Sequence, residues 1–399
     1  MTTLLFLLGI AMALALVVRY LHIPYTVALV IVGILLGGLG VYAPIRCDHD
    51  LIVDGFLPLL LFEASLQVEL PELRHALPTI VALAVPGVIL SALIVGALLH
   101  LTAGLPFALA LLFCALIAAT DPVAVVATFR ELHLPKPLTM LVEGESVLND
   151  GTALVLFSIL LPAAQGRSVD FRLAALQFVT VSIGGLLIGT VAGWLGAVLV
   201  NYTDDHLVEL GLTVLLAYGS YLVAEQIGVS GVIACVSAGL TFTPRSEGTI
   251  SEAARDILTD VWEFAAFLAN TLLFLLMGFL VSLSDLARSV QTVAWAIVAT
   301  LLARAIVVYG LSVPLQLGHR PKLREHQHIV FWSGLRGALA IALALSLPDS
   351  FAQRDLFLRL TFGVVLFTLL IQGLTVRLLI QAVLRPELPA SPPAGPSAP

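Results

Sequence analysis

Long runs of apolar residues follow one another along almost the whole chain, separated by short polar connections. A helix needs about 20 mostly apolar residues to cross the hydrocarbon core of a bilayer. By that criterion the pattern predicts about thirteen spans, near residues 3–19, 24–41, 51–68, 76–100, 105–129, 140–163, 172–201, 206–227, 229–243, 253–282, 290–316, 326–347 and 355–384. The predicted fold is therefore an all-α polytopic membrane protein.

Composition supports this prediction and limits the possible functions. Of the 399 residues, 59% are hydrophobic and only 11% charged, and the mean hydropathy is +1.06; a soluble domain carries about 25% charged residues. The 19 basic residues form no long run, which argues against nucleic-acid binding. The chain has no G-x-x-x-x-G-K-[ST] loop, so we expect no ATP binding and no other cofactor.

Basic residues in the connections indicate the orientation, because they concentrate on the cytoplasmic side. With the N-terminus outside, the inner connections hold 11 Lys and Arg and the outer ones 6, while Arg304 and Arg336 complete the 19 from within spans. An odd number of spans then places the C-terminus in the cytoplasm. Residues 1–385 form the predicted transmembrane domain, and residues 386–399, rich in Pro, Ala and Ser, a short disordered cytoplasmic tail.

Ionisable side chains occur at membrane depth in several predicted spans. They are Glu63 in the third span, Asp121 in the fifth, the acids of 141-LVEGESVLNDGTALVLF-157 in the sixth, Arg304 in the eleventh and Arg336 in the twelfth. Each such group costs about 2.5–3.5 kcal/mol at the centre of an inserted helix. Together they would outweigh the apolar gain of their spans, so we expect them to face one another.

Two spans carry signals that interrupt a helix. The fifth contains Thr120-Asp121-Pro122, and proline removes a backbone donor and clashes with the preceding turn. The twelfth contains 333-SGLRGALA-340, whose glycines permit an unwound segment. Counting spans 1–6 and 8–13 as two halves, the interruptions fall at corresponding positions, which is typical of inverted-repeat transporters with crossed discontinuous helices. An ordinary proline kink is the alternative at Pro122.

The sixth span concentrates oxygen ligands. Ser146 and Asp150 are four residues apart and share one helix face, while Glu145 and Asn149 share the neighbouring face. A carboxylate, a hydroxyl and the free carbonyls of a broken helix would form an all-oxygen cage, which hard cations prefer. Glu143 lies nearer the start of the helix, where the helix dipole stabilises an acid. Its presence is therefore explained without a role in the cage.

The motifs resemble those of the monovalent cation–proton antiporters, in the branch of NhaP-like prokaryotic and NHE-like eukaryotic exchangers. The matching pieces are 62-FEASL-66, 119-ATDPVAV-125, 143-EGESVLNDGTA-153, Arg304 and 334-GLRGALAIAL-343. The resemblance implies a homodimer in the cytoplasmic membrane of a bacterium or archaeon, with contacts to lipid. Each protomer would have a moving core, near residues 76–163 and 290–384, and a scaffold from the remaining helices.

The resemblance also implies the ion ligands. Asp150 would bind the monovalent cation and the proton, Ser146 and the carbonyl of Thr120 would add oxygen ligands, and Glu63 would reach the ion, directly or through water.

Five further residues would support that site by the same resemblance. Asp121 and Asn149 would steady the crossed broken helices. Glu145 would pair with Arg304, and Arg336 would neutralise helix ends in the twelfth span.

These features together predict a secondary antiporter that exchanges Na⁺ or Li⁺ for H⁺. Proton and cation would compete at Asp150, and Asn149 beside it cannot titrate, so one-for-one exchange would move no net charge. Potassium–proton exchange at the same site is the alternative, since a sequence does not define the size of the cage. A cation channel and an intramembrane enzyme are more distant alternatives; the histidines lie in or near the connections, so we expect none of them to activate Ser146.

Overall fold

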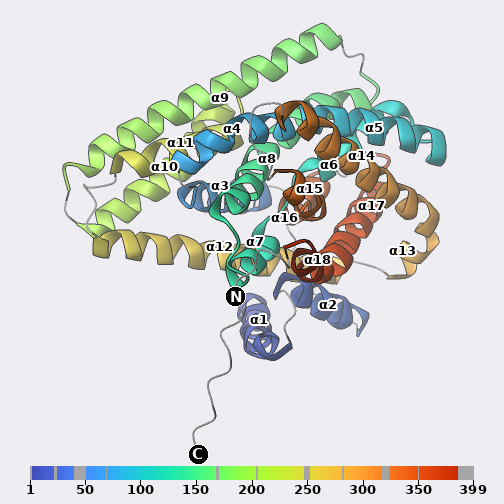
Figure 1. The fold of residues 1–399 in the computed structure, drawn as a ribbon, viewed down its shortest axis with the longest axis horizontal. Helices are drawn as coiled ribbons and strands as arrows, with labels where there is room; N and C mark the ends of the chain where they lie inside the picture. Colours follow the sequence, from blue (N-terminus) through green and yellow to red (C-terminus); the bar gives the residue numbers. More distant parts are fainter. Residues whose placement is uncertain are drawn as a thin grey trace, which may run out of the picture.

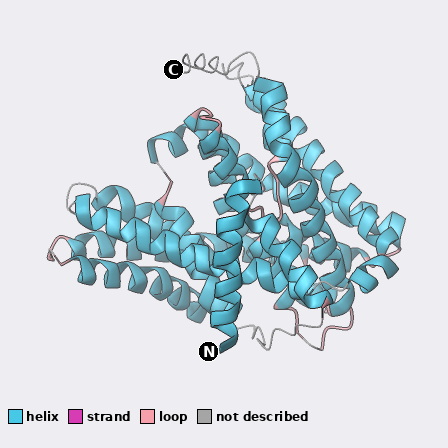
Figure 2. Ribbon diagram, turned by 90° about the horizontal axis from the view of Figure 1, so that it is seen from below, coloured by secondary structure: helices cyan, strands magenta, loops and turns pink. Residues whose placement is uncertain are grey.

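A computed structural model describes the chain over ten stretches, and within them it contains helices and their connections but no strand (Figures 1 and 2). The described residues are 2–21, 25–39, 51–68, 70–167, 170–203, 205–246, 252–280, 283–316, 323–348 and 350–384. The all-helical prediction is confirmed. The predicted tail, residues 386–399, lies outside the described residues.

The first half of the chain forms helices α1 to α8. Their bounds are α1 Thr2–Leu21, α2 Tyr25–Gly38, α3 Leu57–Leu66 preceded by the π-helical turn Leu51–Phe56, α4 Leu70–Ala84, α5 Pro86–Ala103, α6 Phe107–Ala118, α7 Val123–Glu131 and α8 Lys136–Ala164. In place of one span at residues 76–100 the structure has two helices, α4, which begins earlier, at Leu70, and α5, which begins at Pro86. Proline is well tolerated there because it opens α5, where its missing N–H costs little.

The second half forms helices α9 to α18. Their bounds are α9 Phe171–Val200, α10 His206–Ile227, α11 Gly231–Ser246, α12 Glu252–Leu280, α13 Leu283–Arg288, α14 Val290–Gln316, α15 Leu323–Trp332, α16 Ala338–Leu345, α17 Arg354–Phe367 and α18 Leu374–Leu384, with a π-helical turn at Thr368–Gly373 before α18. The short α13 was not predicted.

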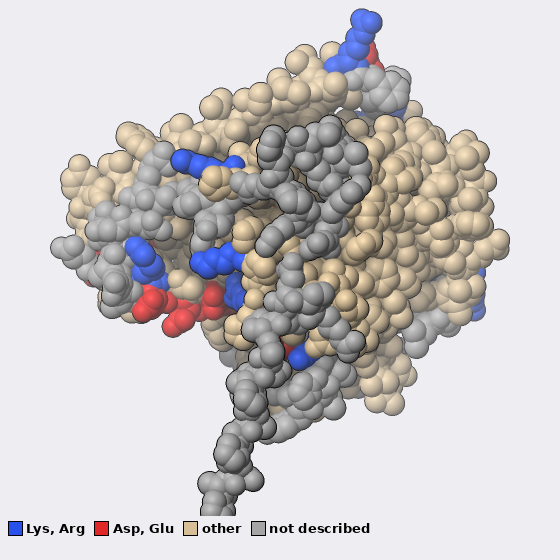
Figure 3. Space-filling model, in the orientation of Figure 1, with Lys and Arg blue, Asp and Glu red and all other residues tan. Residues whose placement is uncertain are grey.

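Eight helical segments of the described chain are long and apolar enough to cross a membrane. They are Leu73–Ala103, Phe107–Glu131, Lys136–Ala164, Arg172–Val200, His206–Ile227, Arg255–Phe279, Val290–Leu311 and Arg354–Leu384. Shorter apolar helices occur at Phe6–Val18, Tyr25–Gly38 and Gly231–Thr243. The total of about thirteen spans stays a prediction. The face shown in Figure 3 is mostly uncharged, as expected of a chain so poor in charge.

Two of the predicted spans are interrupted where the sequence indicates. The chain is not helical at residues 119–122, between α6 and α7, or at residues 334–337, between α15 and α16. Of the eight segments, the one that contains α6 and α7 is the most enclosed. In its most apolar stretch 78% of the residues are buried, against 33% in that of α9. The first interruption therefore lies in the interior, and α9 runs along the edge of the molecule (Figure 1).

Glycines let the outer helices pack closely. Gly185, Gly189 and Gly193 repeat every four residues along one face of α9. A Cβ atom on any of them would overlap backbone carbonyl oxygens of α11 or its N-terminal neighbour Ser230. Such small-residue contacts replace the hydrophobic effect that is missing between helices in lipid.

Candidate functional site

The two unwound segments meet in the interior of the protein. The backbone N–H of Asp121 donates to the carbonyl of Leu335 over 2.9 Å. A Cβ atom added to Gly337 would overlap the side chain of Asp121, so a residue without a side chain is required for this close approach. The helix-breaking residues of the sequence thus serve a crossing of two interrupted spans.

Asp121 lies where two helices begin. Its carboxylate accepts hydrogen bonds from the backbone N–H groups of Val123, at 3.0 Å, and Ala338. These residues are the first of α7 and α16. The first N–H groups of a helix lack intrahelical partners and carry partial positive charge, so one acid stabilises both helix starts.

Arg336 lies where α6 ends. Its guanidinium donates to the carbonyls of Ala118, at 2.8 Å, and Ala119, at 3.4 Å. The last carbonyls of a helix lack partners and carry partial negative charge, which a buried guanidinium compensates. Its own backbone N–H donates to the hydroxyl of Thr368, over 3.1 Å, in the π-helical turn before α18. Arg336 therefore connects the second unwound segment to its neighbours on two sides.

Arg304 and Glu145 form a buried ion pair between α14 and α8. Both terminal nitrogens of Arg304 donate to the carboxylate of Glu145, one of them over 2.9 Å. The side chains are only 10% and 3% exposed. Arg304 also donates to the carbonyl of Val330, over 3.0 Å, in the last turn of α15. The pair therefore connects α8 to the end of the second broken helix.

Asn149 binds the first unwound segment from α8. Its amide nitrogen donates to the hydroxyl of Thr120 over 2.8 Å, and its amide oxygen accepts from the backbone N–H of Thr120 over 3.2 Å. Both residues are buried. Asn149 thus engages the N–H and the hydroxyl of Thr120, and the backbone carbonyl of Thr120 is the polar group that it does not bind.

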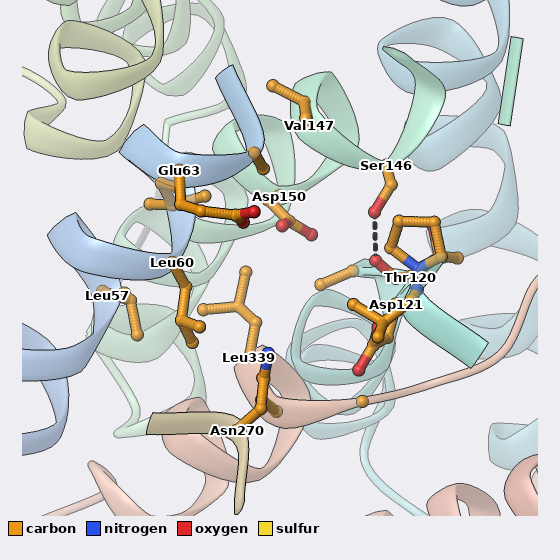
Figure 4. Close-up of a pocket in the computed structure, with 17 residues that line it drawn as sticks. Leu57, Leu60, Glu63, Thr120, Asp121, Ser146, Val147, Asp150, Asn270 and Leu339 are labelled. Atoms are coloured by element: carbon orange, nitrogen blue, oxygen red, sulfur yellow. Dashed lines mark hydrogen bonds between the residues drawn. The ribbon is translucent and has the colours of Figure 1, made fainter. Parts of the chain in front are cut away.

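One cavity of about 100 Å³ brings together the four side chains or carbonyls that were predicted to bind the ion. Asp150 and Ser146 reach it from α8, Thr120 from the first unwound segment and Glu63 from α3 (Figure 4). The carboxylate of Glu63 points toward that of Asp150. Among the described residues, the buried Oδ1 atom of Asp150 has no hydrogen-bond partner.

Every predicted ligand atom is an oxygen. The hydroxyl of Ser146 donates to the carbonyl of Thr120, which leaves its own lone pairs available as acceptors. Two carboxylates, a hydroxyl and a carbonyl suit a hard cation and do not suit zinc or copper, which prefer sulfur or imidazole nitrogen. The cavity can therefore hold a small cation or a proton on Asp150.

Two polar residues near this cavity were missed by the sequence analysis. Asn270 of α12 lines it, and its polar side chain within the apolar run 264-FAAFLANTLLFLLMGFL-280 was the available signal. Gln67 donates to the carboxylate of Glu63, four residues earlier on the same helix face. Glu143, in contrast, lies outside the cavity, where one carboxylate oxygen is 3.8 Å from the guanidinium of Arg130.

Comparison with protein families agrees with this arrangement. The family model described as "Sodium/hydrogen exchanger, transmembrane" matches residues 4–382. The chain is 40% identical over 363 residues to the Na(+)/H(+) antiporter ApNhaP of Aphanothece halophytica, covering 90% of this chain and 70% of that protein. It is 35% identical over 394 residues to the Na(+)/H(+) antiporter NhaH of Halobacillus dabanensis, covering 94% of this chain and 96% of that protein.

The fold is also similar to a solved structure. The sodium proton antiporter MjNhaP1 from Methanocaldococcus jannaschii, determined at pH 8, superposes with a TM-score of 0.78. The match covers 96% of this chain and 97% of that one, at 20% sequence identity. The chain therefore shares its overall fold with a sodium proton antiporter of known structure.

Proposed function

This chain belongs to the transmembrane sodium/hydrogen exchanger family, and we propose that it exchanges sodium or lithium ions for protons across the membrane. The observation that most supports the proposal is the cavity in which Asp150 meets Ser146, Thr120 and Glu63. Within the described structure, Asp150 has a buried carboxylate oxygen with no hydrogen-bond donor. A buried oxygen of this kind is costly unless a guest satisfies it.

A proton and a cation satisfy that oxygen in alternative ways. Loss of water around a carboxylate favours its protonated form, whereas a cation beside it favours the ionised form. The two guests therefore compete for Asp150. If the protein changes the side of access only when one of them is bound, exchange follows without ATP.

The helices that line the cavity suggest which parts move. Asp150, Ser146 and Thr120 belong to the proposed core, near residues 76–163 and 290–384, while Glu63 belongs to the proposed scaffold. Asn270 lines the cavity from α12, also in the scaffold. Movement of the core against the scaffold would carry the ion with Asp150 and leave Glu63 and Asn270 behind.

One titrating carboxylate per cycle implies electroneutral exchange. Asn149, next to Asp150, carries no charge and is engaged with Thr120 on both sides of its amide. One proton leaves as one monovalent cation enters, so no net charge crosses. A current that reverses with membrane potential in planar bilayers would contradict this stoichiometry.

We also propose the setting in which the protein works. It forms a homodimer in the cytoplasmic membrane of a bacterium or archaeon, with the N-terminus outside and the C-terminus inside. The exposed apolar face of α9, which includes Leu176, Ile183 and Leu187, is suited to contact with lipid or a second protomer.

Transport in proteoliposomes tests the proposal. Vesicles loaded with a pH-sensitive dye receive lithium, sodium, potassium or rubidium salts in turn, and the proton flux is recorded. Sodium or lithium should drive proton movement that saturates, with no single-channel current. A response to potassium and not to sodium would establish potassium–proton exchange at the same site, and no response to any cation would refute antiport.

A further inference from the structure

The carboxylate of Glu63 accepts a hydrogen bond at the end of a short chain of polar side chains that lies outside the ion cavity. The side-chain nitrogen of Gln67 donates to Glu63, and the side-chain oxygen of Gln67 accepts from Arg130 over 3.0 Å. On the far side, Arg130 lies 3.8 Å from a carboxylate oxygen of Glu143. The order is therefore Glu143, Arg130, Gln67 and Glu63.

Donor and acceptor chemistry fixes the direction of this chain. A guanidinium has only donors, so the Gln67 atom that faces Arg130 must be the amide oxygen. The amide nitrogen must then face Glu63. The carboxylate oxygen of Glu63 is therefore the acceptor in this bond.

The chain connects two cavities. Glu63 lines the ion cavity, whereas Gln67, Arg130 and Glu143 line a second cavity of about 330 Å³. Glu143 and Asp150 are seven residues apart on α8, so they occupy the same face two turns from each other. The bond between Glu63 and Gln67 is thus the link from the second cavity to the proposed ion site.

The bond to Gln67 restricts the Glu63 side chain at the edge of a cavity that also holds Asp150. A glutamate side chain has several rotatable bonds, so a carboxylate without a fixed partner can point in several directions. The donor on Gln67 therefore limits the direction in which the Glu63 carboxylate points.

We propose that Gln67 is a positioning residue for cation exchange, oriented by Arg130, and that it holds the carboxylate of Glu63 toward Asp150. The inference rests on the proposed function, because it takes Glu63 as part of the ion site. A carboxylate already held toward the cavity loses less side-chain freedom when a cation binds, so Gln67 strengthens cation binding.

Substitution of Gln67 tests this in proteoliposomes. Gln67→Leu should raise the apparent KM for sodium about tenfold, as expected for loss of one hydrogen bond to a charged group. The kcat should stay within about twofold of wild type, because Gln67 lies outside the ion cavity and acts on binding. Gln67→Glu should raise KM further, since it removes the donor and adds an acid.

Arg130 variants test the orientation of the amide. Arg130→Met leaves the Gln67 amide free to rotate and should raise the KM for sodium by less than Gln67→Leu does. Arg130→Lys keeps a donor to Gln67, so its KM should stay near that of wild type. Arg377→Gln is the matched control. It removes an exposed ion pair, 2.9 Å long, between Arg377 of α18 and Glu131, which follows Arg130 on α7. That control should behave as wild type.

A double-mutant comparison decides whether Gln67 acts through Glu63. In a Glu63→Ala background, Gln67→Leu should add no further change in KM; an unchanged tenfold effect there would overturn the inference. A wild-type KM in Gln67→Leu would also overturn it. Lower thermal stability with an unchanged sodium-induced thermal shift would do the same, because it would show a merely structural role. Failure of the proposed function is distinguishable, because wild type itself would then show no exchange.

Discussion

Replacing Arg304 by alanine tests whether the buried ion pair serves the fold or the ion. The substitution removes two charge-assisted hydrogen bonds to Glu145 and the bond to the carbonyl of Val330. It leaves the Glu145 side chain, only 3% exposed, without its counter-charge. Removing one partner of a buried pair costs about 3–5 kcal/mol, a large fraction of the roughly 5–15 kcal/mol that stabilises a typical soluble domain.

The measurement is thermal unfolding in detergent, followed by size-exclusion chromatography, together with sodium-dependent proton flux. Arg304→Ala should lower the unfolding temperature and the yield of assembled protein at least as much as it changes the apparent affinity for sodium. The double variant Arg304→Met, Glu145→Leu should recover part of the loss, since apolar residues of similar volume remove both buried charges.

The result that refutes the reasoning is a stably folded Arg304→Ala protein in which only the apparent sodium affinity has changed. That outcome would place Arg304 in the ion path. A double variant less stable than either single variant would also contradict the argument, because it would mean that the charges stabilise the bundle beyond compensating each other.

Three further substitutions follow from the same geometry. Asp150→Asn should abolish exchange at every pH while the protein still inserts and folds, which proteoliposome flux and thermal unfolding measure together; residual exchange would exclude Asp150 as the shared site. Gly337→Ala should cost about 1–3 kcal/mol and strongly reduce flux, because the added methyl overlaps Asp121 at the crossing; wild-type flux would show that the segments can separate freely. Gly189→Ala should lower the unfolding temperature through overlap with the carbonyl of Ala234, whereas Gly211→Ala, with open space around its added methyl, should be neutral or stabilising; equal effects would remove the role assigned to helix packing.

Hydrophobic runs were sufficient to predict the helices because lipid imposes a single rule on the backbone. Every N–H and C=O at membrane depth must be satisfied, and a helix does so within its own segment. The predicted spans therefore agree closely with the helices, including the interruptions at residues 119–122 and 334–337. Local signals were less informative for the short α13, which was not predicted.

The polar residues of the site were predictable for the same reason, since an ionisable group in an apolar run is expensive and must have a use. Glu63, Asp121 and Asp150 were identified in this way. Asn270 and Gln67 were not, because an uncharged amide costs less and gives a weaker signal. Their significance depends on which side chain they face.

The order of the residues along the chain thus determined an all-helical membrane protein, two broken spans and a small set of buried charges that require partners. Only the tertiary structure decided how those charges are divided: Glu145 pairs with Arg304, Asp121 with two helix starts and Arg336 with helix carbonyls. The reason is geometric, because each of these groups includes a contact between segments far apart in the sequence, up to 218 residues for Arg336 and Ala118. Within the described residues, one oxygen of Asp150 at the cavity still has no hydrogen-bond donor after that division.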